Sequence, residues 1–163
     1  MLAQEIGLSP SAQRTLRLAA LLHDVGKICI PNHILHKPGE LTADEFEVIK
    51  HHVSIAEDLI VDVPDAEEVR TIARHHHERF DGSGYPDGLR GEDIPFLARI
   101  LALADAFSAI TLDRPYRRGL DRDEAYAELQ RVAGTQLDPE LVKSFGRVVV
   151  ALEDEPVATA VPF

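Results

Sequence analysis

The sequence contains a single cysteine, Cys29, among its 163 residues, so no disulfide can form within the chain. Histidine and aspartate are far more abundant, and we therefore expect Cys29 to be a small core residue rather than a metal ligand or nucleophile. No apolar run approaches the roughly 18 residues that a membrane span requires. The first residues also lack the basic and then apolar stretches of a secretory signal. These absences predict a cytoplasmic protein with no membrane insertion.

An excess of positive charge is also missing, because the net charge is −11. Binding to polymeric nucleic acid relies on many lysine and arginine contacts to phosphate, so this class of partner is not expected. A small anionic ligand remains compatible with the charge. Carboxylates gathered around metal cations raise the acidic count of a chain while the site itself stays electrophilic.

Alternation typical of β-strands is nearly absent, whereas helix signals recur along the chain. Glycines and prolines predict ordered loops over 28–40 and 81–88. We expect a single domain over residues 1–152 with an all-α, irregular bundle of about six main helices, and a frayed tail over 153–163. The predicted helices run over about 10–25, 42–60 and 65–77 and then begin at Pro95, Asp121 and Asp138, with caps at Ser9, Thr42 (with Glu45), Asp65 (with Glu68) and Asp121 (with Glu124).

All eight histidines lie between positions 23 and 77. For His36 or His51 alone, a surface position is the simpler interpretation. The pair His23-Asp24 ends an apolar helix, however, and a charged pair anchored there needs partners or a metal. The pair 76–77 closes the third helix in the same way. Asp105 stands in the most apolar segment, where an isolated carboxylate would be a cap or an ion-pair partner, but beside so many histidines a metal is the better interpretation.

The donor set predicts the chemistry of such a site. Adjacent residues on a helix point about 100° apart, so paired ligands suit two neighbouring ions better than one. Imidazole and carboxylate without thiolate favour iron, manganese, nickel or zinc over calcium or a structural zinc. Two ions roughly 3.5–4 Å apart can clamp a phosphoryl group for in-line attack. Phosphoester hydrolysis is the expected reaction.

These residues resemble the signatures of the HD-GYP family, a branch of the HD superfamily of metal-dependent phosphohydrolases. Residues 23–27 (HDVGK) resemble its HD-x-G-K motif, and residues 76–86 (HHERFDGSGYP) resemble its HHE-x-x-DG-x-GYP motif. Asp105 and residues 114–117 (RPYR) resemble two later elements. The resemblance runs from about residue 5 to 146 and implies the irregular helical bundle of the HD superfamily.

The resemblance implies hydrolysis of cyclic di-GMP to linear pGpG or GMP in bacterial second-messenger signalling. Two divalent cations, iron or manganese first and nickel or zinc next, would be bound, with Asp24 bridging them. Of the pair 51–52, the family spacing selects His52 and leaves His51 on the surface. The metal ligands that the resemblance implies are His23, Asp24, His52, His76, His77 and Asp105.

The resemblance also implies contacts to substrate and partner. Lys27 would touch the scissile phosphate and act with Asp24 in catalysis, while Arg114 and Arg117 would hold the phosphates of the dinucleotide. The alternative for both arginines is a solvated helix end. Gly84, Tyr85 and Pro86 would form a surface that meets diguanylate cyclase (GGDEF) domains, or else a rigid loop needed only for the fold.

Two positions depart from the family pattern. The family carries a second aspartate three residues after the one that Asp105 matches, and Ser108 stands there instead, so a carboxylate that could orient a ligand or water is missing. Members also carry an earlier helix with a metal-binding histidine, and no histidine precedes His23. We expect either a piece of a longer regulated protein or a two-metal site with an incomplete set of ligands. Glu5 and His33 are weak substitutes.

Three functions remain open at this point. An active cyclic di-GMP phosphodiesterase is favoured because all six ligand positions are filled. A catalytically weak or inactive signalling module would fit Ser108 and the missing helix. An enzyme acting on another substrate, such as cyclic GMP-AMP or a nucleotide monoester, is the third, and the intact GYP loop disfavours the monoester.

Overall fold

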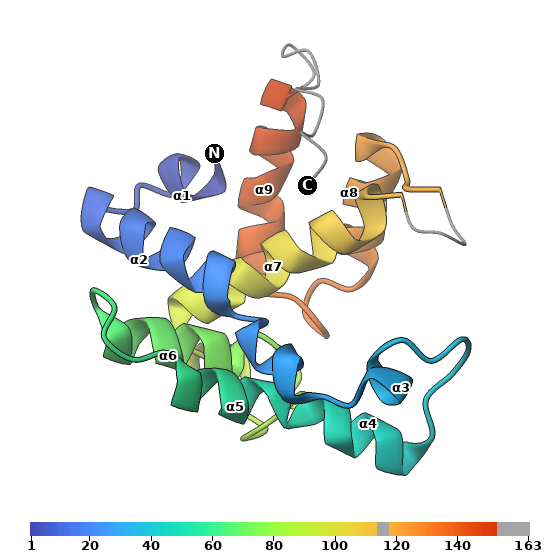
Figure 1. Ribbon diagram of the computed structural model, residues 1–163. Helices are drawn as coiled ribbons and strands as arrows, with labels where there is room; N and C mark the ends of the chain where they lie inside the picture. Colours follow the sequence, from blue (N-terminus) through green and yellow to red (C-terminus); the bar gives the residue numbers. More distant parts are fainter. Residues whose placement is uncertain (114–117, 153–163) are drawn as a thin grey trace.

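The computed structural model describes residues 1–113 and 118–152, which fold into a bundle of helices (Figure 1). No strand occurs among these residues, and a single bridge between Ala133 and Leu137 is the one β contact found there. The predicted all-α fold is confirmed. Its elements in chain order are α1 (Leu2–Glu5), α2 (Pro10–Leu22), η1 (Val25–Cys29), α3 (Asn32–Leu35), α4 (Ala43–Lys50), α5 (His52–Leu59), α6 (Ala66–His75), η2 (Gly91–Asp93), α7 (Phe96–Thr111), α8 (Arg122–Arg131) and α9 (Pro139–Leu152).

Helix starts follow the predicted caps except at α6. Ser9 caps α2, and capping boxes open α4 at Thr42 and α8 at Asp121. Asp65 does begin α6, but its backbone is left-handed (φ 53°) and its side chain makes no cap. Its carboxylate instead accepts a hydrogen bond from the Thr15 hydroxyl (3.1 Å) on α2. The predicted capping box with Glu68 is therefore wrong, because a tertiary contact takes the capping group.

Three predicted boundaries are also wrong. The helix expected over 42–60 is divided into α4 and α5 at His51, where the His51 amide bonds to the carbonyl of Val48 (3.3 Å), three residues back. Helix α2 ends at Leu22, and the 3₁₀ helix η1 follows it. The expected loop over 28–40 contains the end of η1 and the short helix α3. Tight turns of this kind lack the apolar periodicity from which longer helices are predicted.

Helix α7 is the central element of the bundle. It runs across the middle of the molecule and contacts α2, α6, α8 and α9 (Figure 1). The rings of Phe107 on α7 and Phe145 on α9 meet edge to face, with centroids 4.9 Å apart. Most of the side chains buried around α7 are apolar, among them Val69, Ile72, Ile100, Leu101, Leu103, Leu129, Val142 and Val149.

Helix α5 lies beside α6 and also packs against η1 (Figure 1). The η1 turn buries Gly26 and the following Ile30, whereas Cys29 is exposed. The expectation of a buried cysteine is therefore wrong, because the inward positions of this turn belong to other residues. None of the described helices is long and apolar enough to cross a membrane.

Candidate metal centre and its cavity

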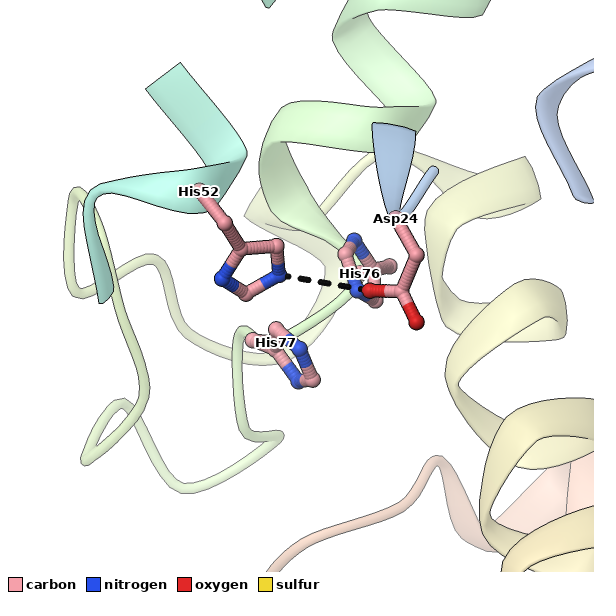
Figure 2. A group of neighbouring side chains, drawn as sticks. All are labelled: Asp24, His52, His76 and His77. Atoms are coloured by element: carbon pink, nitrogen blue, oxygen red, sulfur yellow. Dashed lines mark ion pairs between the residues drawn. The ribbon is translucent and has the colours of Figure 1, made fainter. Parts of the chain in front are cut away.

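Four polar side chains converge where η1, α5 and α6 meet. Asp24 comes just before η1, His52 begins α5, and His76 and His77 follow the last residue of α6. One potential ligand atom from each of the four lies within 4.8 Å of the others. Figure 2 shows the four side chains pointing toward one another. Residues from three separate parts of the sequence thus share one site, which we call the Asp24 cluster.

Gly26 allows the segment that carries Asp24 to pack closely against α5, which carries His52. A Cβ atom at this position would lie 2.0 Å from the backbone oxygen of His52 and 2.7 Å from the amide nitrogen of Ala56. Only glycine permits the backbone of η1 to rest directly on that of α5. The contact places Oδ1 of Asp24 3.5 Å from Nε2 of His52, the pair joined by the dashed line in Figure 2.

Backbone carbonyls fix the orientation of two of the imidazoles. Nδ1 of His52 lies 2.6 Å from the carbonyl oxygen of Ile49, and Nδ1 of His76 lies 2.7 Å from that of Ala73. A carbonyl oxygen only accepts, so both Nδ1 atoms carry the proton and both Nε2 atoms present a lone pair to the cluster.

These lone pairs have no hydrogen-bond partner among the described residues. The same is true of Oδ1 of Asp24, and all three atoms are buried. Buried polar atoms without partners are costly to the fold, and a cation satisfies three acceptors at once. Two imidazole nitrogens and a carboxylate, each oriented by a hydrogen bond on the side away from the cluster, fit a divalent transition metal.

The charge states of the cluster also fit metal binding. Burial lowers the pKa of His76 to about 2 and that of His77 to about 4, and it lowers the pKa of His52 as well. Burial opposes ionisation of Asp24, but the hydrogen bond from Lys27 (2.6 Å) and the nearby histidines outweigh it, so the pKa of Asp24 falls below its usual value. At neutral pH the cluster therefore presents neutral imidazoles and a carboxylate, the forms that bind metal.

Two predicted ligands lie beside the cluster without joining it. The ring of His23 contacts that of His76 (centroids 4.8 Å apart), and Nε2 of His23 lies 3.5 Å from Oδ2 of Asp24. Asp105 on α7 is half-buried and lines the same cavity as His76 and His77. The predicted phosphate-binding residues Arg114 and Arg117 lie outside the described residues.

The remaining candidates from the sequence lie away from the cluster. His51 is exposed, as predicted, although it adjoins His52. His33 is exposed on α3, and Glu5 pairs with Arg147 on α9, so neither substitutes for a missing ligand in this structure. Ser108 is exposed on α7.

A cavity of about 440 Å³ opens beside the Asp24 cluster. Its walls come from α4, the end of α6, the loop after α6, α7 and the turn before α9. Tyr85 stacks on His77 with ring centroids 5.0 Å apart, and burial raises the pKa of Tyr85 to about 12. The polar and aromatic lining residues are Phe46, Lys50, His76, His77, Glu78, Arg79, Ser83, Tyr85, Asp105 and Gln136.

Sequence reasoning missed Phe46 and Lys50 as cavity residues. Their spacing of four on one helix places both side chains on the same face of α4. That helix leads directly to His52, so an aromatic and a cation one helical turn apart just before a predicted ligand were the available signal.

The glycine-rich loop is fixed to the end of α6 by backbone contacts. A Cβ on Gly84 would lie 2.3 Å from the amide nitrogen of Arg79 and 2.6 Å from Cα of Glu78. The Tyr85 amide also donates to the carbonyl of His77 (3.3 Å). The loop that carries Tyr85 and the segment that carries the metal-site histidines are therefore one packed unit.

Asp87 anchors the far end of this loop. Its amide donates to Oε1 of the buried Glu78 (2.7 Å), and its carboxylate accepts two hydrogen bonds from Arg74 (2.8 and 2.9 Å). The bonds from Arg74, with a further one from Nε2 of His75 (2.9 Å), lower the pKa of Asp87 to about 2, and the pKa of Arg74 is raised. Arg74 also pairs with Glu57 on α5 (2.6 Å), so one guanidinium joins the loop to two helices.

Comparison with known proteins identifies the family. A profile of the HD domain family matches residues 1–141. The chain belongs to the HD domain family, in its HD-GYP branch. It is 44% identical over 155 residues to the cyclic di-GMP phosphodiesterase response regulator RpfG of Xanthomonas campestris, covering 94% of this chain and 41% of that protein. It is 35% identical to the 3′3′-cGAMP-specific phosphodiesterase 3 of Vibrio cholerae, covering 95% of this chain and 34% of that protein.

Solved structures agree on the fold. A cyclic GMP-AMP phosphodiesterase of Vibrio cholerae superposes with a TM-score of 0.67 at 19% identity, over 91% of this chain and 41% of the other. An HD-GYP-related protein of Bdellovibrio bacteriovorus gives the same TM-score at 24% identity, over 91% and 48%. This chain spans less than half the length of these relatives. Family and cluster together indicate a divalent-metal site.

Proposed function

We propose that this chain hydrolyses the phosphodiester of a cyclic dinucleotide, with cyclic di-GMP as the first candidate substrate. One observation carries the proposal: Asp24, His52 and His76 each present a buried acceptor without a hydrogen-bond partner among the described residues. A cavity of about 440 Å³ lies beside these three residues. The names of the relatives, which include cyclic di-GMP and 3′3′-cGAMP phosphodiesterases, support the substrate class.

The ligand set supports two divalent cations, with iron or manganese favoured and nickel or zinc possible for these donors. Asp24, His52, His76 and His77 would hold them first, with His23 and Asp105 completing the set from either side. Bound there, the cations would supply Lewis-acid stabilisation of the negative charge that develops on the phosphoryl group.

Lys27 stands at the edge of the cluster in a position suited to substrate. Its ammonium lies 2.6 Å from Oδ2 of Asp24, and the side chain is about one third exposed. A phosphodiester drawn toward Asp24 would therefore meet a cation that is already held in place. We assign Lys27 the role of orienting the scissile phosphate, and Arg114 and Arg117 that of holding the phosphates of the dinucleotide.

The GYP loop forms part of the cavity wall. Gly84 and Tyr85 line the cavity, and Tyr85 is stacked on His77, which favours a role in the site over a freely exposed docking surface. Contact of the residues 84–86 with GGDEF domains stays a prediction. The expected cytoplasmic location and the absence of binding to polymeric nucleic acid also stay predictions.

The alternative function is a metal-binding module with little or no turnover. Ser108 favours it, because the serine is exposed on α7 and offers no carboxylate beside Asp105. Such a module would retain metal without releasing product.

The decisive test compares Asp24→Ala with the neighbouring-histidine control His51→Ala. Protein prepared without oxygen is loaded with ferrous iron or manganese, its metal content is measured by elemental analysis, and products from cyclic di-GMP are separated by chromatography. Asp24→Ala should lose at least one ion, and its turnover should fall by more than about 100-fold, whereas His51→Ala should change neither. Equal losses in both variants would contradict the ligand assignment, and full metal content without product in the unmodified protein would favour the module.

A further inference from the structure

An aromatic corner stands at the mouth of the cavity, outside the Asp24 cluster. Phe46 on α4 is 44% exposed although it is a large apolar residue. Its ring meets that of Tyr85 edge to face, with centroids 6.1 Å apart at an angle of 85°. The ammonium of Lys50 lies 5.0 Å from the Phe46 ring centroid and 5.7 Å from that of Tyr85. Two rings and one cation thus frame a pocket that is open to solvent.

The corner is connected to the metal centre through aromatic contacts. Tyr85 stacks on His77 on one side and meets Phe46 on the other. His77, Tyr85, Phe46 and Lys50 all line the same cavity. This wall therefore offers a surface for the base of a nucleotide whose phosphate is bound at the cluster.

We propose that Phe46 and Lys50 form the binding site for one purine base of the substrate, with guanine preferred. This inference rests on the proposed function and deepens it. A purine would pack its π-face on the exposed Phe46 ring, as bases do on aromatic side chains. The Lys50 ammonium would donate to O6 and N7 of guanine, which are both acceptors, whereas adenine offers an amino donor in place of O6. Lys50 would thereby discriminate guanine from adenine.

A purely structural role for Phe46 explains the observations less well. The loop that carries Tyr85 is already fixed by the backbone contact at Gly84, by the Tyr85 amide and by the anchor at Asp87. Phe46 adds little to this attachment and leaves much of its own ring in solvent.

Lys50 is likewise available to a ligand. Its partner Glu47 (2.6 Å) is two thirds exposed, and surface pairs of this kind contribute little to stability. The ammonium can therefore move from Glu47 to a ligand at small cost.

The chain contains matched controls for both side chains. Phe96, on α7, is 43% exposed and lies under the guanidinium of Arg99 (5.2 Å), so it repeats the pairing of Phe46 with a cation but does not line the cavity. Lys143 on α9 pairs with Glu140 and also lies away from the cavity. Effects specific to the proposed base site should appear in variants of Phe46 and Lys50 and be absent from these two.

The test measures kcat and KM for cyclic di-GMP, 3′3′-cGAMP and cyclic di-AMP with Phe46→Leu, Lys50→Met, Lys50→Arg and the controls Phe96→Leu and Lys143→Met, all at equal metal content. Phe46→Leu should raise KM about tenfold for all three substrates with kcat nearly unchanged. Lys50→Met should raise KM about tenfold for cyclic di-GMP and much less for cyclic di-AMP. Lys50→Arg should restore the preference, because arginine also donates to O6 and N7.

Other outcomes would overturn the inference in distinguishable ways. Unchanged KM values in Phe46→Leu and Lys50→Met would show that no base binds there. A fall of kcat in Phe46→Leu, with weaker binding of manganese in a separate titration, would assign the ring to support of the site. If the unmodified protein turns over none of the substrates, the proposed function fails. Equilibrium binding of cyclic di-GMP to manganese-loaded protein then tests the base site alone. About tenfold weaker binding in Phe46→Leu and in Lys50→Met would support the base site, and binding equal to that of the unmodified protein would overturn it.

Discussion

Two regions of this molecule are stabilised in different ways. The region from Asp24 to the GYP loop is built from short helices, and the four buried side-chain polar atoms without partners found in the described residues all belong to it. The region from α7 to α9 is packed by apolar side chains, with Leu103, Leu129 and Val149 almost fully buried. We call them the polar and the apolar region. The polar region also buries apolar side chains such as Val53 and Ile72, but among the described residues it alone contains buried acceptors that a cation would satisfy.

The sharpest way to break the polar region is to add one methyl group at Gly26. Gly26→Ala places a Cβ where backbone atoms of His52 and Ala56 already lie, so η1 must move away from α5. We expect the free energy of unfolding to fall by about 3 kcal/mol or more and bound metal to be lost. Urea denaturation and elemental analysis measure the two effects.

Gly134→Ala in the apolar region is the control for this change. Gly134 has φ +80°, and no atom lies within 4 Å of the position that a Cβ would take there, so alanine meets backbone strain without a clash. A cost of roughly 1–2 kcal/mol with full metal content is expected. Retention of metal by Gly26→Ala would show that the close contact does not set the geometry of the cluster.

A cavity in the apolar region should lower stability without affecting the metal site. Leu129 on α8 is 2% exposed, and Leu129→Ala should cost about 2–3 kcal/mol of unfolding free energy. Metal bound per folded molecule, measured below the unfolding transition, should not change. Loss of metal from folded Leu129→Ala protein would mean that the two regions cannot be separated in this way.

The smallest expected effect concerns the anchor of the GYP loop and depends on pH. The pKa of Asp87 is lowered to about 2, chiefly by the hydrogen bonds from Arg74, so the folded state binds a proton less readily than the unfolded state. The stability from this carboxylate is present above the unfolded pKa of about 4 and is lost as pH falls toward 2. Asp87→Asn should therefore cost roughly 1 kcal/mol at pH 7, a figure reduced for solvent screening.

Urea denaturation of metal-free protein between pH 7 and pH 2.5 measures this difference. The gap between the unmodified protein and Asp87→Asn should narrow as the pH falls. The exposed Asp93 offers a control, since Asp93→Asn removes a carboxylate from the same part of the chain. A gap that stays constant over this range would argue that Asp87 acts through shape rather than charge.

The sequence allowed the helices and part of the site to be predicted because their signals are local. Capping boxes such as the one at Thr42 depend on residues three apart, and the structure contains them at α4 and α8. Asp65 was predicted wrongly because a residue fifty positions away, Thr15, binds its carboxylate. Cys29 was predicted wrongly because composition carries no information on which residues of a short turn face inward.

The same difference between local signals and contacts formed only on folding applies to the candidate site. Motifs around His23 and His76 singled out Asp24, His76 and His77, and the family spacing singled out His52. The structure brings these four of the six predicted ligands into one group. The cavity residues Phe46 and Lys50 were missed because only the folded loop brings Tyr85 against α4. The spacing of residues along the chain does not predict a contact of this kind between distant segments.

The backbone carbonyls behind His52 and His76 have a consequence for the thermodynamics of metal binding. Each imidazole is already held in one orientation by a carbonyl of its own preceding turn. The rotational entropy of these side chains is therefore lost during folding and not when an ion arrives. The ordering of these two side chains thus adds no entropic cost to metal binding, and their rotamers should be the same with and without an ion.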